Sequence, residues 1–225
     1  EKLLAAADMA SELAHQINNP LSAVTGAIYM ATRHAGTDPE LAKYLKIADT
    51  EGKRLANIAR QLVTLYAPAS EPEAVDVREI VNAAITSCGR QFRERRDTLE
   101  AQLEWTGRIV GFRDELRQAV LNLLTNAVEH SPESSRIVVR TRRARFWQRS
   151  GSRGVRITVA NDGPGFPERR IGEMLEPFSG TKQQRGTGLG LWVTRSVIAK
   201  HGGKLKVRST AKKTVCVVYL PAKAG

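Results

Sequence analysis

The sequence is poor in cysteine, with only Cys88 and Cys216 among its 225 residues. The two lie far apart, so they form neither the close spacing of a zinc site nor a disulfide framework. This excludes a small secreted domain held together by disulfides and favours a reducing cytoplasm, where both thiols are core residues. The sequence also lacks any run of ~20 apolar residues that could span a bilayer, and it has no signal peptide. We therefore expect a cytoplasmic chain with no membrane segment.

An initiator methionine is also absent, because the sequence begins at Glu1. We interpret the chain as a fragment whose upstream region is missing, which leaves open whether the full-length protein is soluble or membrane-anchored. The 225 residues are enough for one large domain or two modest ones with real cores.

Acidic residues are in the minority only in the second part of the chain. Residues 1–67 hold 7 Lys+Arg and 7 Asp+Glu, and the other 28 Lys+Arg and 16 Asp+Glu lie in residues 68–225. The second part therefore carries the whole net charge of +12. Such a segment suits a polyanionic ligand, whether nucleic acid, anionic lipid or a nucleoside triphosphate, and charge alone does not choose among them.

Apolar residues recur at spacings of three and four through the first thirty residues. This heptad pattern predicts one long helix of a coiled coil or bundle, through Leu3, Ala7, Ala10, Ala14, Ile17, Leu21, Val24, Ile28 and Ala31. A turn follows, with Asp38 as N-cap and Pro39 at the first position of a second helix. A lone hairpin buries only one side of each helix, so we expect it to dimerise into a four-helix bundle. Packing on the chain's own second domain is the alternative.

A segment rich in proline, alanine and glutamate predicts a linker at residues 68–74, between a first domain at 1–67 and a second at 75–225. In the second domain the patterns predict, in order, a helix at 77–88, strands at 98–105 and 108–111, a helix capped by Asp114 and running through Ala127, strands at 136–146 and 154–160, a helix at 189–201, and strands at 204–209 and 214–220. This order favours an α+β sandwich with a mostly antiparallel sheet and helices on one face.

Residues 136–156 contain eight arginines, and no acidic residue occurs from Ser134 to Asn161. Interleaved with Phe146 and Trp147, these arginines could form a nucleic-acid patch. We favour a solvated hairpin, because strand alternation places the arginines on one face and turns Val139 and Thr141 partly inward. We therefore expect no direct contact with nucleic acid.

Four segments of the second domain suit a nucleotide. Asn122 and Asn126 lie four apart on one helix face, where amide oxygens can meet hydrated Mg²⁺ and phosphate. Residues 159–167 end a strand in a Gly-Pro-Gly turn, which lets backbone approach a flat ligand closely. Residues 176–185 have the polar, basic composition of a lid. Residues 186–193 place glycines at the start of a helix, whose N–H groups suit an anion.

The order of these segments, preceded by the histidine in ELAHQINNPL, resembles the sensor histidine kinases of two-component systems. The resemblance covers essentially the whole chain and rests on LAHQINNPL, NLLTNA, GPG and GTGLGL. It implies a homodimeric histidine-phosphotransfer hairpin followed by an ATP-binding domain of the Bergerat type, with a missing sensor domain upstream. It also implies that His15 accepts the γ-phosphoryl group of ATP·Mg²⁺ and passes it to an aspartate of a response-regulator receiver domain.

The resemblance assigns roles to individual residues. In the hairpin it implies a catalytic group of His15, Gln16 and Asn19. In the second domain it implies nucleotide contacts from Asn122, Asn126, His130, Asn161, Asp162, Gly163, Gly165, Lys182, Arg185, Gly186, Thr187, Gly188, Leu189 and Gly190. Asn126 would meet Mg²⁺ through the bound ATP.

Four residues depart from the family's pattern. Gln16 stands where many relatives have Glu or Asp, and an amide cannot act as a base, so we expect slower autophosphorylation, which Gln16→Glu would raise. Asn161 stands where Asp usually reads adenine, which makes Asp162 an alternative reader. Glu129 replaces a lysine, so we expect no phosphate contact there, and Leu175 replaces a phenylalanine of the lid.

Asn122 separates two reaction classes. Bergerat-fold ATPases place Glu there to activate water, and Asn cannot deprotonate water, which favours a kinase. Two alternatives stay open. One is a phosphatase-leaning or weakly active family member, in which Gln16 and Asn19 orient an attacking water. The other is a Bergerat-fold ATPase with an Arg-rich hairpin that binds nucleic acid.

Overall fold

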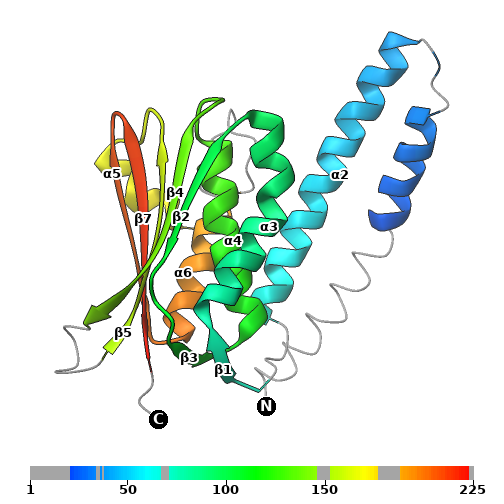
Figure 1. Cartoon of the computed structure of the whole chain (residues 1–225). Coiled ribbons are helices and arrows are strands. Elements are labelled where there is room, and N and C mark those ends of the chain that lie inside the picture. The colour runs from blue at the N-terminus through cyan, green and yellow to red at the C-terminus, as the bar shows by residue number, and fades with distance from the viewer. Residues whose placement is uncertain are drawn as a thin grey trace. The chain divides into compact units, whose positions relative to one another are not determined.

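The computed structural model describes residues 21–33, 36, 38–66, 71–145, 153–176 and 188–222. The chain divides into two compact units, Glu1–Pro68 and Ala69–Gly225, which Figure 1 shows with their element labels. The linker at 68–74 stays a prediction, and the first strand of the second unit begins inside that range, at Glu73.

The N-terminal unit is a helical hairpin. Residues 21–33 are helical, and α2 runs Pro39–Tyr66. Asp38 caps α2 as predicted, because its Oδ1 accepts hydrogen bonds from the backbone N–H groups of Glu40 at 3.0 Å and Leu41 at 3.2 Å. Residues 1–20, which hold the first part of the predicted heptad pattern, lie outside the described residues.

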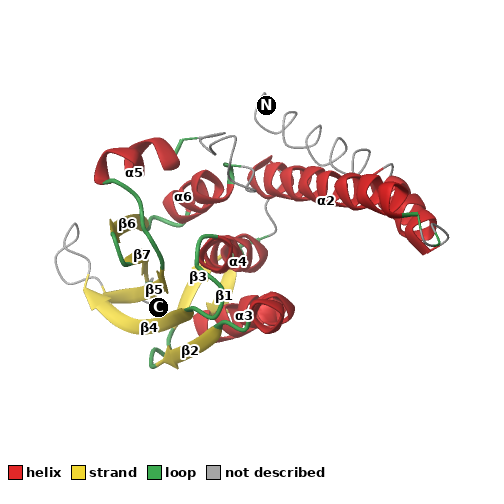
Figure 2. Ribbon diagram, turned by 90° about the horizontal axis from the view of Figure 1, so that it is seen from above, coloured by secondary structure: helices red, strands yellow, loops and turns green. Residues whose placement is uncertain are grey.

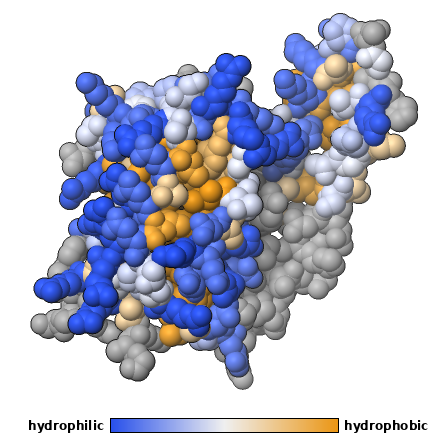
Figure 3. Space-filling view, in the orientation of Figure 1, coloured by the Kyte–Doolittle hydropathy of each residue, from blue (hydrophilic) through white to orange (hydrophobic). Residues whose placement is uncertain are grey.

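The two helices of the hairpin approach each other closely and still leave large apolar side chains exposed. A Cβ added at Gly52 of α2 would lie 3.1 Å from Thr25 Cγ2, so the two helices approach closely there. Close to this contact on α2, Leu41, Tyr44 and Leu55 recur at heptad-like spacing and are 43%, 62% and 55% exposed. Apolar surface of this unit is visible in Figure 3. The hairpin therefore presents an apolar stripe to solvent.

The C-terminal unit is an α/β sandwich. Its elements in chain order are β1 Glu73–Asp76, α3 Val77–Arg95, β2 Thr98–Leu103, β3 Arg108–Gly111, α4 Arg113–Glu129, β4 Arg136–Arg145, β5 Arg153–Asp162, α5 Glu168–Met174, α6 Gly190–Lys200, β6 Lys204–Thr210 and β7 Lys213–Pro221. The main sheet has the order β2-β4-β5-β7-β6, and β1 pairs with β3 in a second, small sheet. Helices α3, α4 and α6 lie on one face of the main sheet, as Figure 2 shows from above. The predicted α+β class, with a hairpin followed by a mostly antiparallel sandwich, is confirmed.

Strand alternation places the core between this sheet and the helices. On β5, Val155, Ile157 and Val159 point inward and are at most 2% exposed. Helices α4 and α6 also carry fully buried side chains, among them Leu123, Leu124 and Ile198, and Ile157 of β5 lines a small internal cavity together with Ile198. Both cysteines are buried and unpaired, as predicted. Within the described ranges, none of the helices has the length and apolarity needed to cross a membrane.

Several local predictions were wrong. Asp114 is not the N-cap of α4, because Phe112 holds that position and Asp114 pairs with Arg117 in the first turn. Helix α3 extends beyond residue 88, since Phe92 continues its buried side to Arg95. The parallel pairing of β2 with β4 was left undecided by the prediction of a mostly antiparallel sheet, and the short elements β1 and α5 were not predicted. Elements this short carry too little periodicity to be recognised.

The Arg-rich stretch forms an antiparallel pair of strands, β4 and β5. Val139 and Thr141 are fully buried, which is deeper than the partly inward position predicted, and Val138 beside them is buried too. Arg136 and Arg142 pair with Glu100 and Glu104 of the neighbouring β2 segment, at 2.6 and 3.0 Å. Part of the positive charge is therefore balanced by acids that lie far away in the sequence. Residues 146–152, the predicted tip, lie outside the described residues.

Candidate functional site

Helix α4 directs its two asparagines toward the start of α6. Asn122 is 5% exposed, accepts a hydrogen bond from Gln118 Nε2 at 2.8 Å and donates one to the Gly190 carbonyl oxygen at 3.3 Å. A Cβ at Gly190 would lie 3.6 Å from both amide atoms of Asn126. The asparagine segment and the second glycine segment therefore meet, although they are more than sixty residues apart in the sequence.

The first turn of α6 suits an anion. Its N-cap residue, Leu189, makes no side-chain capping hydrogen bond within the described part of the chain. Gly188 precedes it with φ +67°, a conformation that glycine adopts without strain. A helix start without a side-chain cap directs its N–H groups and the positive end of the helix dipole outward. Phosphate oxygens are the ligands that such a terminus prefers.

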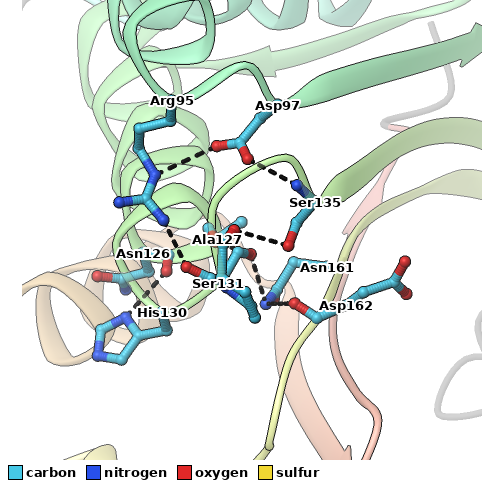
Figure 4. Close-up of polar contacts among 10 residues, drawn as sticks. Arg95, Asp97, Asn126, Ala127, His130, Ser131, Ser135, Asn161 and Asp162 are labelled. Carbon is cyan, nitrogen blue, oxygen red and sulfur yellow. Dashed lines mark hydrogen bonds and ion pairs between the residues drawn. The ribbon is translucent and has the colours of Figure 1, made fainter.

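Asn161 lies at the end of β5 with its side chain turned inward. It is 6% exposed, and its Nδ2 donates to Ser131 Oγ and to the Asp162 carbonyl oxygen, both at 3.1 Å. The next residue, Asp162, is exposed, and its carboxylate points away from Ser131 (Figure 4). Alternation along β5 therefore turns Asn161, rather than Asp162, toward the end of α4.

The Gly-Pro-Gly turn is held against the β6–β7 turn. The Gly163 N–H donates to the Lys212 carbonyl oxygen at 3.1 Å, and the Phe166 N–H donates to Ser209 Oγ at 2.8 Å. Gly165 has φ +64°, and a Cβ there would overlap the Thr210 carbonyl oxygen. Only glycine fits at this position, since both the backbone angle and the space exclude a side chain.

His130 joins α4 to this turn. Its Nδ1 lies 2.9 Å from the Asn126 carbonyl oxygen, and its ring packs edge-on against Phe166 with 5.7 Å between ring centres. A Cβ at Gly163 would lie 3.0 Å from the His130 carbonyl oxygen and 3.6 Å from Asn161 Nδ2. A continuous set of contacts therefore links Gly190, the two asparagines of α4, His130, the Gly-Pro-Gly turn and Asn161.

Glu129 stands beside His130, at the position where the family resemblance led us to expect a lysine. The residue is exposed as a whole, but desolvation by its surroundings raises the pKa of its carboxyl, while His130 and Arg95 oppose that shift. A carboxyl group cannot supply the phosphate contact of a lysine.

The remaining predicted site residues fall in segments that the structure does not describe. These are His15, Gln16, Asn19, Lys182, Arg185, Gly186 and Thr187. The contacts above therefore concern the asparagine segment, the Gly-Pro-Gly turn and the start of α6.

Three polar residues of the site were not found from the sequence. Gln118 hydrogen-bonds Asn122, Ser131 hydrogen-bonds Asn161, and Ser209 holds the Gly-Pro-Gly turn. Gln118 lies one helical turn before Asn122, which is a signal that spacing could have given. Ser131 and Ser209 meet their partners only through the packing of α4 and β6 against β5 and its turn, so no local pattern identifies them.

The polar residues of the site suit a magnesium ion that binds together with the phosphates of a nucleotide. The described residues contain no group of three or more His, Cys, Asp or Glu side chains that could hold a metal ion. Asn126 offers a neutral amide oxygen beside the start of α6. Mg²⁺ commonly takes one or two protein oxygens and completes its shell with water and substrate phosphates, which fits these residues.

Two family models match the chain. The model for "Histidine kinase-, DNA gyrase B-, and HSP90-like ATPase" matches residues 111–224, about half of the chain, and the model for "His Kinase A (phospho-acceptor) domain" matches residues 5–70. The second range includes His15, and the first includes every described site residue.

Among curated relatives, the sensor histidine kinase ZraS of Salmonella typhi is 33% identical over 98% of this chain and 47% of its own length. The sensory histidine kinase/phosphatase NtrB of Escherichia coli O157:H7 is 29% identical over 97% of this chain and 63% of its own. The chain thus spans about half to two thirds of these relatives. The solved complex of histidine kinase ThkA with response regulator TrrA matches in fold, with a TM-score of 0.65, 24% identity, and coverage of 96% of this chain and 61% of that one.

The matched ranges follow the order of the two units, first the phosphoacceptor hairpin and then the ATPase-type sandwich that carries the asparagine and glycine segments. The chain therefore belongs to the sensor histidine kinase family.

Proposed function

We propose that this chain is the kinase core of a two-component system, which phosphorylates His15 with ATP and transfers the phosphoryl group to an aspartate of a response regulator. The observation that carries the proposal is that Asn122 and Asn126 contact Gly190 at the start of α6, while Asn161 hydrogen-bonds Ser131 just beyond the end of α4. Its chemistry suits a nucleoside triphosphate, and the phosphoacceptor family model spans His15.

The proposed reaction is an in-line transfer to a ring nitrogen. A neutral imidazole, with a reference pKa of ~6.5, has one nitrogen lone pair free at pH 7. The lone pair of His15 attacks the γ-phosphorus, the bond to the β–γ bridging oxygen breaks, and ADP leaves with its electron pair as the ring loses its N–H proton. Mg²⁺, when bound, neutralises developing charge on the phosphate oxygens.

Asn122 makes competing hydrolysis slow. Its Oδ1 and Nδ2 are engaged by Gln118 and Gly190, so the amide has a fixed structural role. An amide also has no basicity with which to activate water. We infer that the γ-phosphoryl group is kept for His15 rather than lost to solvent.

Adenine recognition is assigned to Asn161. Its Nδ2 is occupied by Ser131 and Asp162, which leaves Oδ1 to accept a hydrogen bond from the adenine amino group. Asp162, the alternative reader, is exposed and directed elsewhere. Lys182 and Arg185 of the predicted lid, with Gly186 and Thr187, are assigned to the phosphates because of their charge and position before α6.

We infer that the active form is a homodimer in the cytoplasm. The exposed stripe of Leu41, Tyr44 and Leu55 repeats at the spacing of a bundle seam, and a second copy of the hairpin would cover it. The two reduced, buried cysteines fit a cytoplasmic location. The solved complex of ThkA with the response regulator TrrA supports a receiver domain as partner, and we place its docking on the first helix, below His15.

The test is phosphorylation with γ-labelled ATP. We expect wild-type protein to gain label that is labile to acid and stable to base, as a phosphoramidate is, and we expect His15→Ala to lose all of it. His34→Ala is the matched control, since it removes another histidine of the same unit and should retain the label. Label in His15→Ala at the level of the wild type would overturn the proposal.

A phosphatase activity is the second candidate. NtrB, a relative of 29% identity, is named a kinase/phosphatase. Gln16 and Asn19 carry amides that can orient an attacking water without acting as bases. Release of phosphate from a phosphorylated receiver domain by His15→Ala protein would support this activity, and its loss in Asn19→Ala would locate it.

A further inference from the structure

The asparagine at the end of β5 poses a problem that a carboxylate would not. A carboxylate accepts hydrogen bonds through both oxygens, whereas an asparagine amide accepts on one side and donates on the other. Adenine presents an amino donor at the position where guanine presents a carbonyl acceptor. The orientation of the Asn161 amide therefore decides which base the site accepts.

Two acceptors fix that orientation. Ser131 Oγ donates its only hydrogen to the Ala127 carbonyl oxygen at 2.5 Å, so it meets Asn161 Nδ2 as an acceptor, at 3.1 Å. The other partner of Nδ2 is the Asp162 carbonyl oxygen, which can only accept. A flipped amide would place Oδ1 against both oxygens and lose both hydrogen bonds.

Ser131 is itself held by a residue at the end of α3. Its carbonyl oxygen accepts from Arg95 Nη2 at 2.5 Å, and Arg95 Nε reaches Asp97 at 3.3 Å. The Asp97 side chain is fully buried and accepts from the Ser135 N–H at 2.9 Å. Figure 4 shows this chain of contacts from the end of α3 to the end of β5. Ser131 and Asn161 are 7% and 6% exposed, so water does not readily replace either partner.

We propose that Ser131 is a specificity-determining positioning residue, which locks the Asn161 amide with Oδ1 toward the nucleotide and so selects adenine over guanine. The inference rests on the proposed function, because it takes Asn161 as the reader of the base. It explains how this chain tolerates Asn where the resemblance leads one to expect Asp. The hydrogen bond to Ser131 fixes which atom of the Asn161 amide faces the nucleotide, and a carboxylate would not need this because its two oxygens are equivalent.

The experiment measures equilibrium dissociation constants for ATP and GTP by competition with a fluorescent nucleotide. We expect Ser131→Ala to lower the ratio of GTP to ATP dissociation constants by roughly five- to tenfold, the effect of losing one of two orienting hydrogen bonds. Ser135→Ala is the matched control. It lies in the same loop, and its hydroxyl donates to the Pro132 carbonyl oxygen and not to Asn161, so the ratio should stay unchanged.

A second background separates orientation from general loosening. In Asn161→Asp protein both reader atoms are acceptors, so adding Ser131→Ala should leave the ratio unchanged even if both affinities fall. The proposal would be overturned if Ser131→Ala alone changed the ATP and GTP affinities equally. It would also be overturned if Ser131→Ala changed the ratio by the same factor in the Asn161→Asp background. Failure of the proposed function would give a different result. His15 would gain no label from γ-labelled ATP, although the protein still binds nucleotide. A wild type that binds neither nucleotide overturns both.

Discussion

The two units of the chain bury their apolar residues in different ways. In the described residues, large apolar side chains that stay exposed lie mostly on the hairpin, at Val24, Tyr29, Met30, Leu41, Tyr44, Ile47 and Leu55, and only Val110 represents the C-terminal unit. Conversely, among the described residues, every buried apolar residue except Ala59 belongs to the C-terminal unit. The sandwich thus has a core of its own, whereas the hairpin depends on another surface.

This difference follows from geometry. A five-stranded sheet covered by three helices encloses a layer of side chains on its own. Two helices have only one shared stripe, so a helix with a wider apolar face keeps the rest exposed until a second hairpin covers it. The comparison predicts that the same kind of substitution has different consequences in the two units.

The largest effect is expected from removing a buried leucine. Leu124 is fully buried in α4, and Leu124→Ala should lower the free energy of unfolding of the C-terminal unit by about 3 kcal/mol, through lost burial and the cavity left behind. All three tryptophans, Trp105, Trp147 and Trp192, lie in this unit, so their fluorescence during denaturant unfolding follows it selectively. The matched hairpin change, Leu55→Ala, should leave that transition in place. Equal shifts from both variants would contradict separate cores.

A smaller effect is expected on assembly. Leu55→Asp places a charge on the exposed stripe, and desolvating that charge at a dimer interface should weaken dimerisation at least tenfold. Sedimentation velocity over a concentration series measures the change. Val110→Asp introduces the same charge at the exposed apolar residue of the other unit, and it should leave the mass unaltered. A dimer of undiminished strength in Leu55→Asp would show that another surface mediates assembly.

The smallest effect concerns the two thiols, both in the C-terminal unit. Burial raises the pKa of Cys216 to about 12, and burial is also the main cause that raises the pKa of Cys88. At pH 8 the folded Cys216 is thiolate in only about one molecule in 10⁴, so iodoacetamide should label it only after the unit opens. Because the folded pKa is the higher one, the thiol's contribution to stability is complete below about pH 9 and is lost as pH rises toward 12.

Labelling at pH 8 in increasing denaturant should therefore follow the tryptophan transition, and it should be insensitive to Leu55→Asp. Rapid labelling of the native protein at pH 8 would show that the thiols are accessible without unfolding of the C-terminal unit.

Most of the fold could be predicted from the sequence because long elements repeat their pattern. The run of Leu116, Val120, Leu123 and Ala127 indicated α4, and Asp38 with Pro39 indicated the start of α2. The short elements β1 and α5 could not be found in this way, since four or seven residues do not establish a period. The parallel pairing of β2 with β4 depends on contacts between strands remote in the sequence.

Residue types and the spacing of NLLTNA, GPG and GTGLGL are local properties of the chain, so the sequence alone was enough to predict a nucleotide-binding site. Packing of the folded chain was needed to select which of two neighbours, Asn161 or Asp162, turns inward, and which atom of the Asn161 amide is left for a ligand. Those choices depend on strand register and on Ser131, thirty residues away, and a hydrogen bond of that kind exists only once the two segments are packed together.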